Sequence, residues 1–221
     1  KRSRADGGAK RSRADGAAAP NLISRALRDG FVREAALLPS NEADAAAALV
    51  AAAPEAAWQT SDAGADAKAH RVKNATRHRY SVGDGGEDAP DAEVQRLFER
   101  VLDAAAPRAW RLSRGYVPRL QLGRYRAGDF IGRHDDSSVV DIGGVPHSRR
   151  VAIVYYLTGE PPWETSMGGL FVDHPTGRRF APSHNALVAF SVPRLHEVTR
   201  VATERPRYSV FGWLYFRRAD I

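Results

Sequence analysis

The sequence predicts an α+β fold in which helices pack against an antiparallel sandwich or barrel, such as a jelly roll. Two observations support this fold class. The first half of the chain contains two segments with helical patterns. After Pro107 the chain changes to short runs of β-branched and aromatic residues separated by turn formers. Helices that precede a series of short strands are typical of folds in which helices cover an antiparallel sheet.

Two helices are expected. For the first, over residues 41–53, Ser40 suits the N-cap and Pro54 ends the helix. Glu42 and Asp44 suit its first turn, where the helix dipole favours negative charge. The second helix, over residues 92–105, carries apolar residues on one face: Val94, Leu97, Phe98, Val101 and Leu102.

Five strands are expected, over residues 117–125, 150–157, 168–173, 185–192 and 207–216. Between the two helices, residues 59–76 and 82–92 are polar and rich in Gly, Asp, Ala and Ser, with the extended stretch RHRYSV between them. We interpret this part as a long loop or loop pair, and loops of this length in a compact domain are often functional. Closure over a bound peptide and a loop without function both fit the pattern.

Composition fits a soluble globular protein. The chain has 221 residues, of which 43% are hydrophobic and 27% charged, enough for one domain with a sizeable core. It has no cysteine, which excludes disulfides and thiolate metal sites and favours an intracellular protein of the nucleus, the cytoplasm or both. The longest aliphatic run, residues 45–53, is too short to cross a bilayer, so we expect no membrane partner.

Positive charge is concentrated at the N-terminus. The net charge is +7, and residues 1–16 supply +4 of it through six basic and two acidic residues. The motif KRSRADG occurs at 1–7 and again at 10–16, without apolar anchors. We therefore predict a disordered basic tail over residues 1–19 and a single domain over 20–221. A tail used for nuclear import or nucleic-acid contact and a merely solvated tail both fit. The body is only mildly basic, so a nucleic-acid partner is not expected.

The stretch RHDDSS, residues 133–138, contains a histidine followed by two aspartates. If this segment is extended, residues two apart point to the same face of the strand. Asp136 then shares a face with His134, and Asp135 points away. One histidine and one carboxylate do not complete a metal site, because a facial triad needs a second imidazole.

His196 is the candidate for the second imidazole. It is one of seven histidines, lies 62 residues after His134 and follows the apolar run NALVAFSV. Beyond it, Arg207 and Ser209 are again two apart on an expected strand, so they share a face. Arginine is suited to a bidentate grip on a carboxylate, and a hydroxyl beside it can donate a further hydrogen bond. The ordered set of His-x-Asp, a distant His and Arg-x-Ser is more specific than the His-x-Asp motif alone.

Several stretches together carry a resemblance to a known family. They are HDD (134–136), RRVAIVYYL (149–157), PPW (161–163), SMGGL (166–170), LVAFSV (187–192), HEV (196–198) and RYSVFGW (207–213). With them, residues 117–216 resemble the iron(II)- and 2-oxoglutarate-dependent oxygenases. The likeness is greatest to the prolyl hydroxylases that modify a small-subunit ribosomal protein at the decoding centre. PPW followed by SMGG indicates this ribosomal subfamily, and the hypoxia-sensing prolyl hydroxylases look like its next nearest relatives.

The resemblance implies a double-stranded β-helix core, of the jelly-roll or cupin-like kind, supported by N-terminal helices. It implies that Fe(II) is bound by His134, Asp136 and His196. It also implies that 2-oxoglutarate is the cosubstrate, with O2 as oxidant and ascorbate as reductant. The products would be a hydroxylated proline, succinate and CO2.

Further residues take roles from the same resemblance. Arg207 would pair with the far carboxylate of 2-oxoglutarate, helped by Tyr156, Ser209 and Tyr125. Arg149 and Trp213 fall where relatives meet the protein substrate. The segment 137–148 is longer than expected for the ribosomal subfamily, and we interpret His147 within it as a loop histidine.

Other functions stay open at this point. A hydroxylase of another protein, similar to the hypoxia sensors, would use the same residues. A nucleic-acid demethylase of the same superfamily should show aromatic or basic elements for flipping and stacking bases, and no clear set is visible along the chain. A binding module that uses the barrel as a scaffold need not retain the full His-Asp-His-Arg set.

Overall fold

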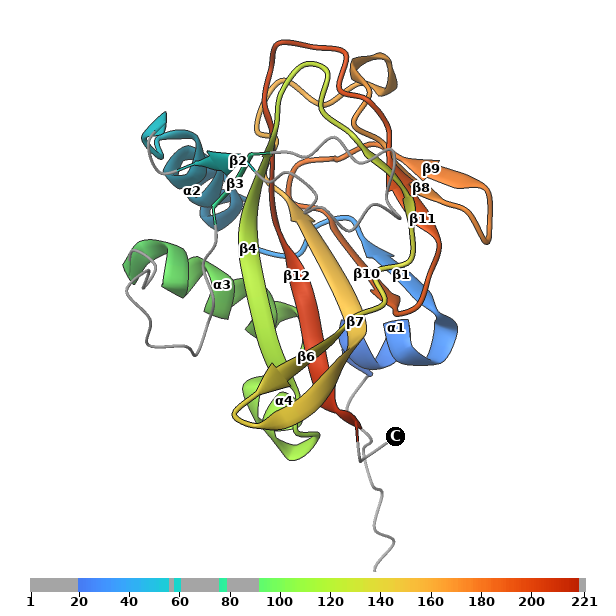
Figure 1. Cartoon of the computed structure of the whole chain (residues 1–221). Coiled ribbons are helices and arrows are strands. Elements are labelled where there is room, and N and C mark those ends of the chain that lie inside the picture. The colour runs from blue at the N-terminus through green and yellow to red at the C-terminus, as the bar shows by residue number, and fades with distance from the viewer. Residues whose placement is uncertain (1–19, 56–57, 61–75, 79–91, 219–221) are drawn as a thin grey trace, which may run out of the picture.

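The computed structural model describes residues 20–55, 58–60, 76–78 and 92–218. The predicted tail and most of the predicted loop pair lie outside the described residues. Two antiparallel sheets face each other, with helices on the outside of the larger one (Figure 1). The prediction of an α+β jelly-roll fold is confirmed. Within the part of the chain that the structure describes, no helix is both long and apolar enough to span a bilayer.

The main sheet has the strand order β1-β10-β7-β12-β4-β3-β2, and β6 pairs with β7 off this path. Its strands are β1 (Phe31–Glu34), β2 (Gln59–Thr60), β3 (Thr76–His78), β4 (Val117–Tyr125), β6 (Val139–Ile142), β7 (Val145–Tyr156), β10 (Leu187–Ser191) and β12 (Arg207–Arg217). The smaller sheet has the order β5-β11-β8-β9. Its strands are β5 (Ile131–His134), β8 (Phe171–Asp173), β9 (Arg178–Phe180) and β11 (His196–Val198).

The helices are α1 (Leu22–Asp29), α2 (Ser40–Ala51), α3 (Ala92–Ala105) and α4 (Arg108–Ser113), and a short 3-10 helix, η2, spans Thr165–Met167. The expected 92–105 helix is found with these bounds as α3. The expected 41–53 helix is α2, but its start was predicted wrongly. Ser40 is already helical, and Pro39 occupies the cap position without a side-chain hydrogen bond. The Pro39 carbonyl accepts from the Glu42 and Ala43 amides at 3.0 Å, so the helix begins one residue earlier than predicted.

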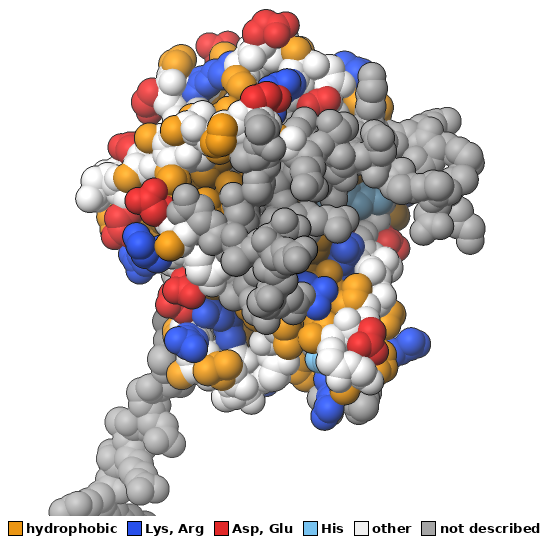
Figure 2. Space-filling view, turned by 60° about the vertical axis from the view of Figure 1, so that its left-hand side comes forward, with side chains coloured by type: hydrophobic (Ala, Val, Ile, Leu, Met, Phe, Trp, Pro, Cys, Tyr) orange, Lys and Arg blue, Asp and Glu red, His pale blue; other side chains and the backbone are white. Residues whose placement is uncertain are grey.

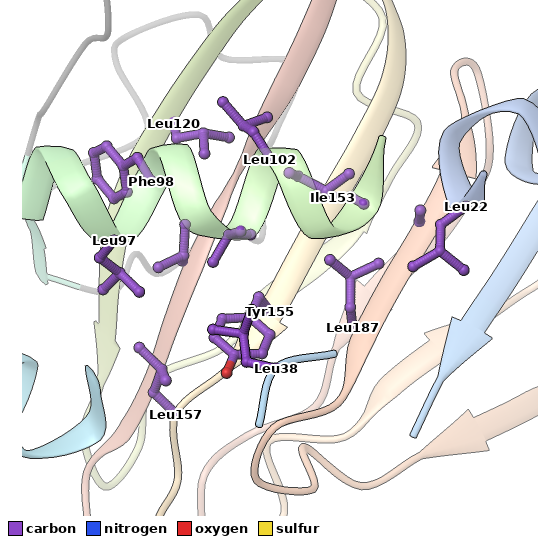
Figure 3. Close-up of a cluster of buried hydrophobic side chains, with 14 of the residues drawn as sticks. Leu22, Leu38, Leu97, Phe98, Leu102, Leu120, Ile153, Tyr155, Leu157 and Leu187 are labelled. Atoms are coloured by element: carbon purple, nitrogen blue, oxygen red, sulfur yellow. The ribbon is translucent and has the colours of Figure 1, made fainter. Parts of the chain in front are cut away.

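Helix α3 forms the outer layer of the core. Its apolar face lies across the main sheet, with Leu97, Phe98 and Leu102 among side chains of β4 and β7 (Figure 3). Burial of each large apolar side chain stabilises the fold by about 1.5–3 kcal/mol. A second apolar cluster lies between the two sheets and includes Phe171, Phe190 and Tyr156. The functional residues described below border this second cluster.

Segment 137–148 differs from the expectation. It forms a β-hairpin in which β6 pairs with the start of β7, and Gly143 and Gly144 supply the left-handed turn. His147 lies within β7 and is buried, so its interpretation as a loop histidine was wrong. Two glycines in left-handed conformations are what a two-residue hairpin turn requires. This signal was present in the sequence as DIGGVP.

Candidate metal and cosubstrate site

Three predicted ligands converge at the edge of the smaller sheet. One ligand atom each from His134, Asp136 and His196 lies within 4.8 Å of the others. The His134 Nε2 atom is 3.3 Å from Asp136 Oδ1, and His196 Nε2 is 3.6 Å from Asp136 Oδ2. Donors about 2.1 Å from a metal and at right angles to each other are about 3 Å apart. The spacing and the chemistry of two imidazoles with one carboxylate therefore fit a facial metal site.

A β-bulge brings β5 into this arrangement. His196 pairs with His134, and Val198 pairs with Ile131. An interval of three residues on β5 therefore lies opposite an interval of two residues on β11. The extra residue shifts the alternation of β5. As a result Ile131 and His134 both line the cavity, although they are an odd number of residues apart. Bulges next to active sites commonly re-aim a side chain in this way.

Asp136 reaches the site by a different route from the one predicted. Strand β5 ends at His134, and Asp136 follows it in a left-handed conformation, with φ of 64°. The backbone therefore turns after the strand, and the shared-face argument for an extended segment does not apply. Asp136 nevertheless lies beside the two histidines. The neighbouring Asp135 accepts a hydrogen bond from the Ser137 amide through its Oδ1 atom.

Both histidines have their Nδ1 atoms engaged by the backbone. His134 Nδ1 donates to the Gly132 carbonyl at 2.7 Å, and His196 Nδ1 donates to the Arg194 carbonyl at 2.8 Å. A carbonyl can only accept, so the hydrogen lies on Nδ1 and the Nε2 lone pair is left for a metal. Burial, together with the charge of His134, lowers the pKa of His196 despite the nearby Asp136. The neutral imidazole that a metal requires is thereby favoured.

A buried ion pair between Arg194 and Asp173 fixes the backbone next to His196. Arg194 donates from Nε and Nη2 to the two oxygens of Asp173, at 2.6 and 2.8 Å, and Asp173 is only 1% exposed. Asp173 also stands opposite His196 in the β8–β11 register. Arg194 further donates to the Gly30 carbonyl. The carbonyl that orients His196 is thus fixed to both β8 and the N-terminal segment.

Asp136 is held by two side chains from the main sheet. Trp213 Nε1 donates to Asp136 Oδ2 at 3.0 Å, and Arg149 Nη1 donates to the Asp136 carbonyl at 3.2 Å. The Arg149 guanidinium lies over the Trp213 ring, 3.5 Å from its centroid. Burial alone would raise the pKa of Asp136. Hydrogen bonds from His134 and Trp213, with the charges of the two histidines, instead lower it to about 2.

Three of the four predicted cosubstrate residues line a cavity that also contains the three ligands, and Tyr156 is not in its wall. Its volume is about 70 Å³, and Tyr125, Arg207 and Ser209 are in its wall together with the His-Asp-His set. Arg207 is 1% exposed, and its guanidinium carbon lies 4.8 Å from the Tyr125 ring and 4.9 Å from the Tyr156 ring. The remaining wall is mostly apolar: Ile131, Ala152, Ile153, Val154, Phe171, Phe190, Val198 and Phe211, with Gly212 and Trp213.

Two buried polar atoms beside this cavity lack partners. Neither the Tyr156 hydroxyl nor Arg207 Nε has a hydrogen-bond partner among the described residues. Burial raises the pKa of Tyr156, while the Arg207 charge acts in the opposite direction, so the hydroxyl remains a donor. Buried polar groups are almost always satisfied. A cationic donor and a hydroxyl left unpaired side by side fit a site for an anionic ligand such as a carboxylate.

The SMGG motif explains how Arg207 is accommodated. Gly169 has a left-handed φ of 64°, and a Cβ there would come within 2.9 Å of Arg207 Cδ. Trp163, from the PPW motif, donates through Nε1 to the Gly168 carbonyl at 2.9 Å. The two motifs thus form one loop that packs against the buried arginine. Sequence analysis missed this structural role, as well as the support from Asp173 and Arg194, because the Gly169–Arg207 and Asp173–Arg194 contacts join residues 38 and 21 positions apart.

Comparison with known proteins agrees with this geometry. Residues 120–215 match the sequence profile of the 2OG-Fe(II) oxygenase superfamily. The matched region runs from β4 through most of β12 and contains the whole His-Asp-His-Arg set. None of the curated proteins compared with this sequence matches it.

Solved structures with this fold include several prolyl hydroxylases. A prolyl-4-hydroxylase from Pseudomonas putida matches at 21% identity with a TM-score of 0.58, covering 89% of this chain and 100% of its own. A prolyl hydroxylase from Trichoplax adhaerens, in complex with a hypoxia inducible factor peptide fragment, matches at 16% identity with a TM-score of 0.59, covering 90% and 89%. The non-heme α-ketoglutarate-dependent epimerase SnoN from nogalamycin biosynthesis matches at 15% identity with a TM-score of 0.56, covering 89% and 82%. Each likeness shows the fold alone.

The fold and the matched region define an enzyme class, that of the 2OG-Fe(II) oxygenases, whose superfamily model matches residues 120–215. The expected fold class and enzyme class are confirmed. This class implies Fe(II), 2-oxoglutarate and O2 as the cofactor, cosubstrate and oxidant, and the His-Asp-His group has the donor set for such a metal.

Proposed function

We propose that this oxygenase hydroxylates a prolyl residue of a protein, and that the protein is a small-subunit ribosomal protein. The observation that carries the oxygenase assignment is the cavity that joins His134, Asp136 and His196 to the buried Arg207, whose Nε has no hydrogen-bond partner among the described residues. The choice of proline as target is supported by the solved prolyl hydroxylases that share the fold. The choice of the ribosomal subfamily is supported by the PPW and SMGG motifs.

In this proposal His134, Asp136 and His196 hold Fe(II). Each imidazole donates its Nδ1 hydrogen to a backbone carbonyl, so Nε2 is the atom that would bind the metal, and the carboxylate, with a pKa of about 2, is ionised at neutral pH. Trp213 and Arg149 keep Asp136 in its left-handed conformation, a role more direct than the peptide contact implied by resemblance. A further contact of these two residues with the protein substrate remains a prediction.

Arg207 would pair with the far carboxylate of 2-oxoglutarate. Tyr156 would donate its unpaired hydroxyl to the same group, and Ser209 and Tyr125 lie in position to complete its surroundings. Charge-assisted hydrogen bonds in a buried site are about twice as strong as neutral ones, which suits the grip on a small dicarboxylate. The apolar wall would exclude water, so these bonds would not be weakened by solvent.

When bound, the iron supplies the activation of O2 that couples decarboxylation of 2-oxoglutarate to substrate hydroxylation. The protein supplies placement, a dry cavity and a substrate entry beside His134, whose side chain is 28% exposed. We propose ascorbate as the reductant that keeps the iron active. An intracellular location, in the nucleus, the cytoplasm or both, accompanies the proposed substrate.

Mass spectrometry tests the proposal. Peptides from small-subunit ribosomal proteins are incubated with the enzyme, Fe(II), 2-oxoglutarate and ascorbate. We expect a gain of one or two oxygen masses on proline that depends on 2-oxoglutarate. His134→Ala and Asp136→Ala should abolish turnover because each removes a ligand. Asp135→Ala should retain it, since the Asp135 carboxylate accepts from the Ser137 amide and is not one of the three ligands.

The outcomes separate the parts of the proposal. Succinate formed without peptide oxidation would keep the oxygenase and reject the ribosomal substrate, and hypoxia-factor-like peptides would be tried next. Equal loss of activity in Asp135→Ala and Asp136→Ala would contradict the ligand assignment.

A further inference from the structure

One end of the main sheet gathers arginines from three separate segments. Helix α4 with the turn after it, the start of β7 and the end of β12 lie together at the lower end of the molecule in Figure 1. Residues 107–119, 145–150 and 215–218 contain eight arginines and no aspartate or glutamate. The register confirms their proximity, because Arg217 pairs with His147 and Phe216 with Ser148. We call this region the arginine-rich end: Arg108, Arg111, Arg114, Arg119, Arg149, Arg150, Arg217 and Arg218.

Aromatic rings connect the arginines on the helix-covered side. Arg114 lies over the Trp110 ring, Trp110 stacks on Tyr116 at 5.7 Å between centroids, and Tyr116 contacts Phe216 at 5.3 Å. Burial raises the pKa of Tyr116, and the charges of Arg150 and Arg114 act to lower it, so both cations lie near this ring. Leu112, at the tip of α4, is 65% exposed. The cations therefore surround an apolar, aromatic surface.

Half of these arginines are exposed and have no acidic counterpart among the described residues. The buried Arg111, in contrast, pairs with Asp103 at 2.8 Å. The exposed Arg108, Arg114, Arg217 and Arg218 form no ion pair with any residue that the structure describes. A hollow of about 210 Å³ lies between α3 and α4. Arg108, Leu112 and Tyr116 are in its wall on the α4 side, and the carboxylates of Glu99 and Asp103 line it on the α3 side. Figure 2 shows Lys and Arg side chains beside hydrophobic ones at the lower end of the face that it presents.

We propose that the arginine-rich end binds a single-stranded nucleic acid. Arginine forks match phosphate oxygens, and the clustered charge attracts a polyanion. Bases can pack against Leu112 and the exposed parts of Trp110 and Tyr116, as bases do on aromatic platforms of single-strand binding surfaces. The combination of cations with aromatic rings favours this partner over an acidic peptide, which would leave the rings unused. It also favours this partner over a membrane, because Leu112 is the only exposed large hydrophobic side chain of residues 107–119, 145–150 and 215–218.

Apart from Arg149, which donates to the Asp136 carbonyl, the surface is distinct from the metal site. Its helix-covered side faces away from the cavity, since Tyr116 and Trp110 pack with the helix-side core. Along the sequence the set was not visible, because its members are spread over more than a hundred residues. The fold brings them together, and the inference does not rest on the proposed hydroxylation.

Fluorescence anisotropy with the full chain tests the proposal. The probes are labelled single-stranded RNA and DNA of about 20 nucleotides, of mixed sequence, titrated at several salt concentrations. Arg108→Glu/Arg114→Glu is compared with Arg178→Glu/Arg179→Glu, which makes the same charge change at exposed positions of β9 in the other sheet. The basic tail is the same in all three proteins.

We expect the Arg108/Arg114 variant to bind at least tenfold more weakly. Loss of two phosphate contacts should reduce the slope of log K against log salt by about 1.4, at about 0.7 per contact. The Arg178/Arg179 variant should bind within about twofold of the unmodified protein. Ultraviolet crosslinking should attach the probe at Trp110, Tyr116 or Phe216, a readout that does not depend on any substitution.

Several results would overturn the proposal. Equal weakening in both variants would mean that only net charge matters, and no binding at low salt would reject a nucleic-acid surface outright. Tighter binding to vesicles with anionic lipid, or to an acidic peptide, would assign the surface to that partner. Thermal unfolding and circular dichroism of each variant identify a binding loss caused by misfolding. In that case the site of crosslinking on the unmodified protein decides whether the arginine-rich end binds the probe.

Discussion

Asp173 is a carboxylate whose charge depends on the folded structure. Burial alone would raise its pKa. Hydrogen bonds from Arg194 and Thr176 and the charges of Arg194 and His196 hold the pKa below its ordinary value of 3.8. The folded protein therefore binds fewer protons at this group than the unfolded chain does. Asp173 contributes stability above the unfolded pKa, and this contribution is lost as the pH falls through the folded pKa.

We expect the free energy of unfolding to fall as the pH is lowered from about 5 toward 3, and Asp173→Asn to flatten this dependence. The substitution should also weaken metal binding, because Arg194 would lose the partner that fixes the carbonyl next to His196. Urea unfolding at a series of pH values measures the first effect. Asp103→Asn is the control, since its carboxylate is 46% exposed in its pair with Arg111. An identical pH dependence in wild type and Asp173→Asn would contradict the prediction.

Trp213 donates the hydrogen bond that orients the Asp136 carboxylate. Trp213→Phe keeps an aromatic ring in the wall but removes the donor. Loss of such an outer partner typically weakens metal binding 10–100-fold. Titration with Co(II), followed by absorbance, measures the affinity without turnover. Tyr215→Phe, which removes only a partner of Arg149 Nε, should leave the affinity nearly unchanged. Unchanged Co(II) affinity in Trp213→Phe with a raised KM for peptide would instead support a role in substrate binding.

For single residues, the sequence predicted which side chains lie together but not the backbone conformations that bring them together. His134, Asp136, His196, Arg207 and Ser209 were all found from spacing, order and resemblance, and all line one cavity. The route by which Asp136 arrives was missed, because a left-handed aspartate after a bulged strand has no periodic signature. The supporting pairs were missed because they join strands far apart in the chain.

Among the elements, the loop of the PPW and SMGG motifs controls the space around Arg207. Gly169→Ala adds a methyl group that must displace Arg207 Cδ, in a backbone conformation costing about 1–2 kcal/mol for an L residue. We expect a raised KM for 2-oxoglutarate, in the direction of Arg207→Ala but smaller. Gly177→Ala shares the left-handed φ, 68° against 64°, and meets nothing within 4 Å.

The comparison of these two glycines separates the effect of backbone strain from the effect of displacing the Arg207 side chain. Both variants should lose stability in thermal unfolding, and only Gly169→Ala should change the KM. Equal KM values in the two variants would show that the loop does not set the position of the arginine.

Long elements were predictable and short ones were not. Helix α3 and strand β4 were predicted with their observed bounds, because each has a sustained pattern over nine residues or more. Strands β5, β9 and β11 have three or four residues, too few for a pattern, and they form because the main sheet offers a facing layer. Helix α1 and strand β1 were also missed, although Asn21 caps α1 and Gly30 ends it with a left-handed φ of 78°. The predictions over residues 1–19 and 61–75 concern parts outside the described residues.

At the scale of the whole molecule, the candidate metal site joins separate parts of the chain. Its ligands come from β5, the turn after it and β11. A metal that binds only the folded state should therefore raise stability, by about 2.7 kcal/mol at one hundred times its Kd. We expect Mn(II) or Co(II) to raise the Tm of the wild type and not of His196→Ala. His147→Ala is the control, because this buried histidine lies outside the group. A shift that persists in His196→Ala would place the metal elsewhere.

The hydrogen bond from each histidine to the carbonyl two residues before it has a consequence for how such sites originate. His134, His147 and His196 all make this bond, at 2.7 or 2.8 Å, although only two of them belong to the metal group. In these three extended tripeptides that end in histidine, the local backbone thus places the imidazole hydrogen on Nδ1, without help from any distant part of the chain. A histidine that is designed into a strand with this geometry would therefore have its hydrogen on Nδ1 and its lone pair on Nε2. What remains to be built is the convergence of the lone pairs, and in this protein a single inserted residue in β5 provides it.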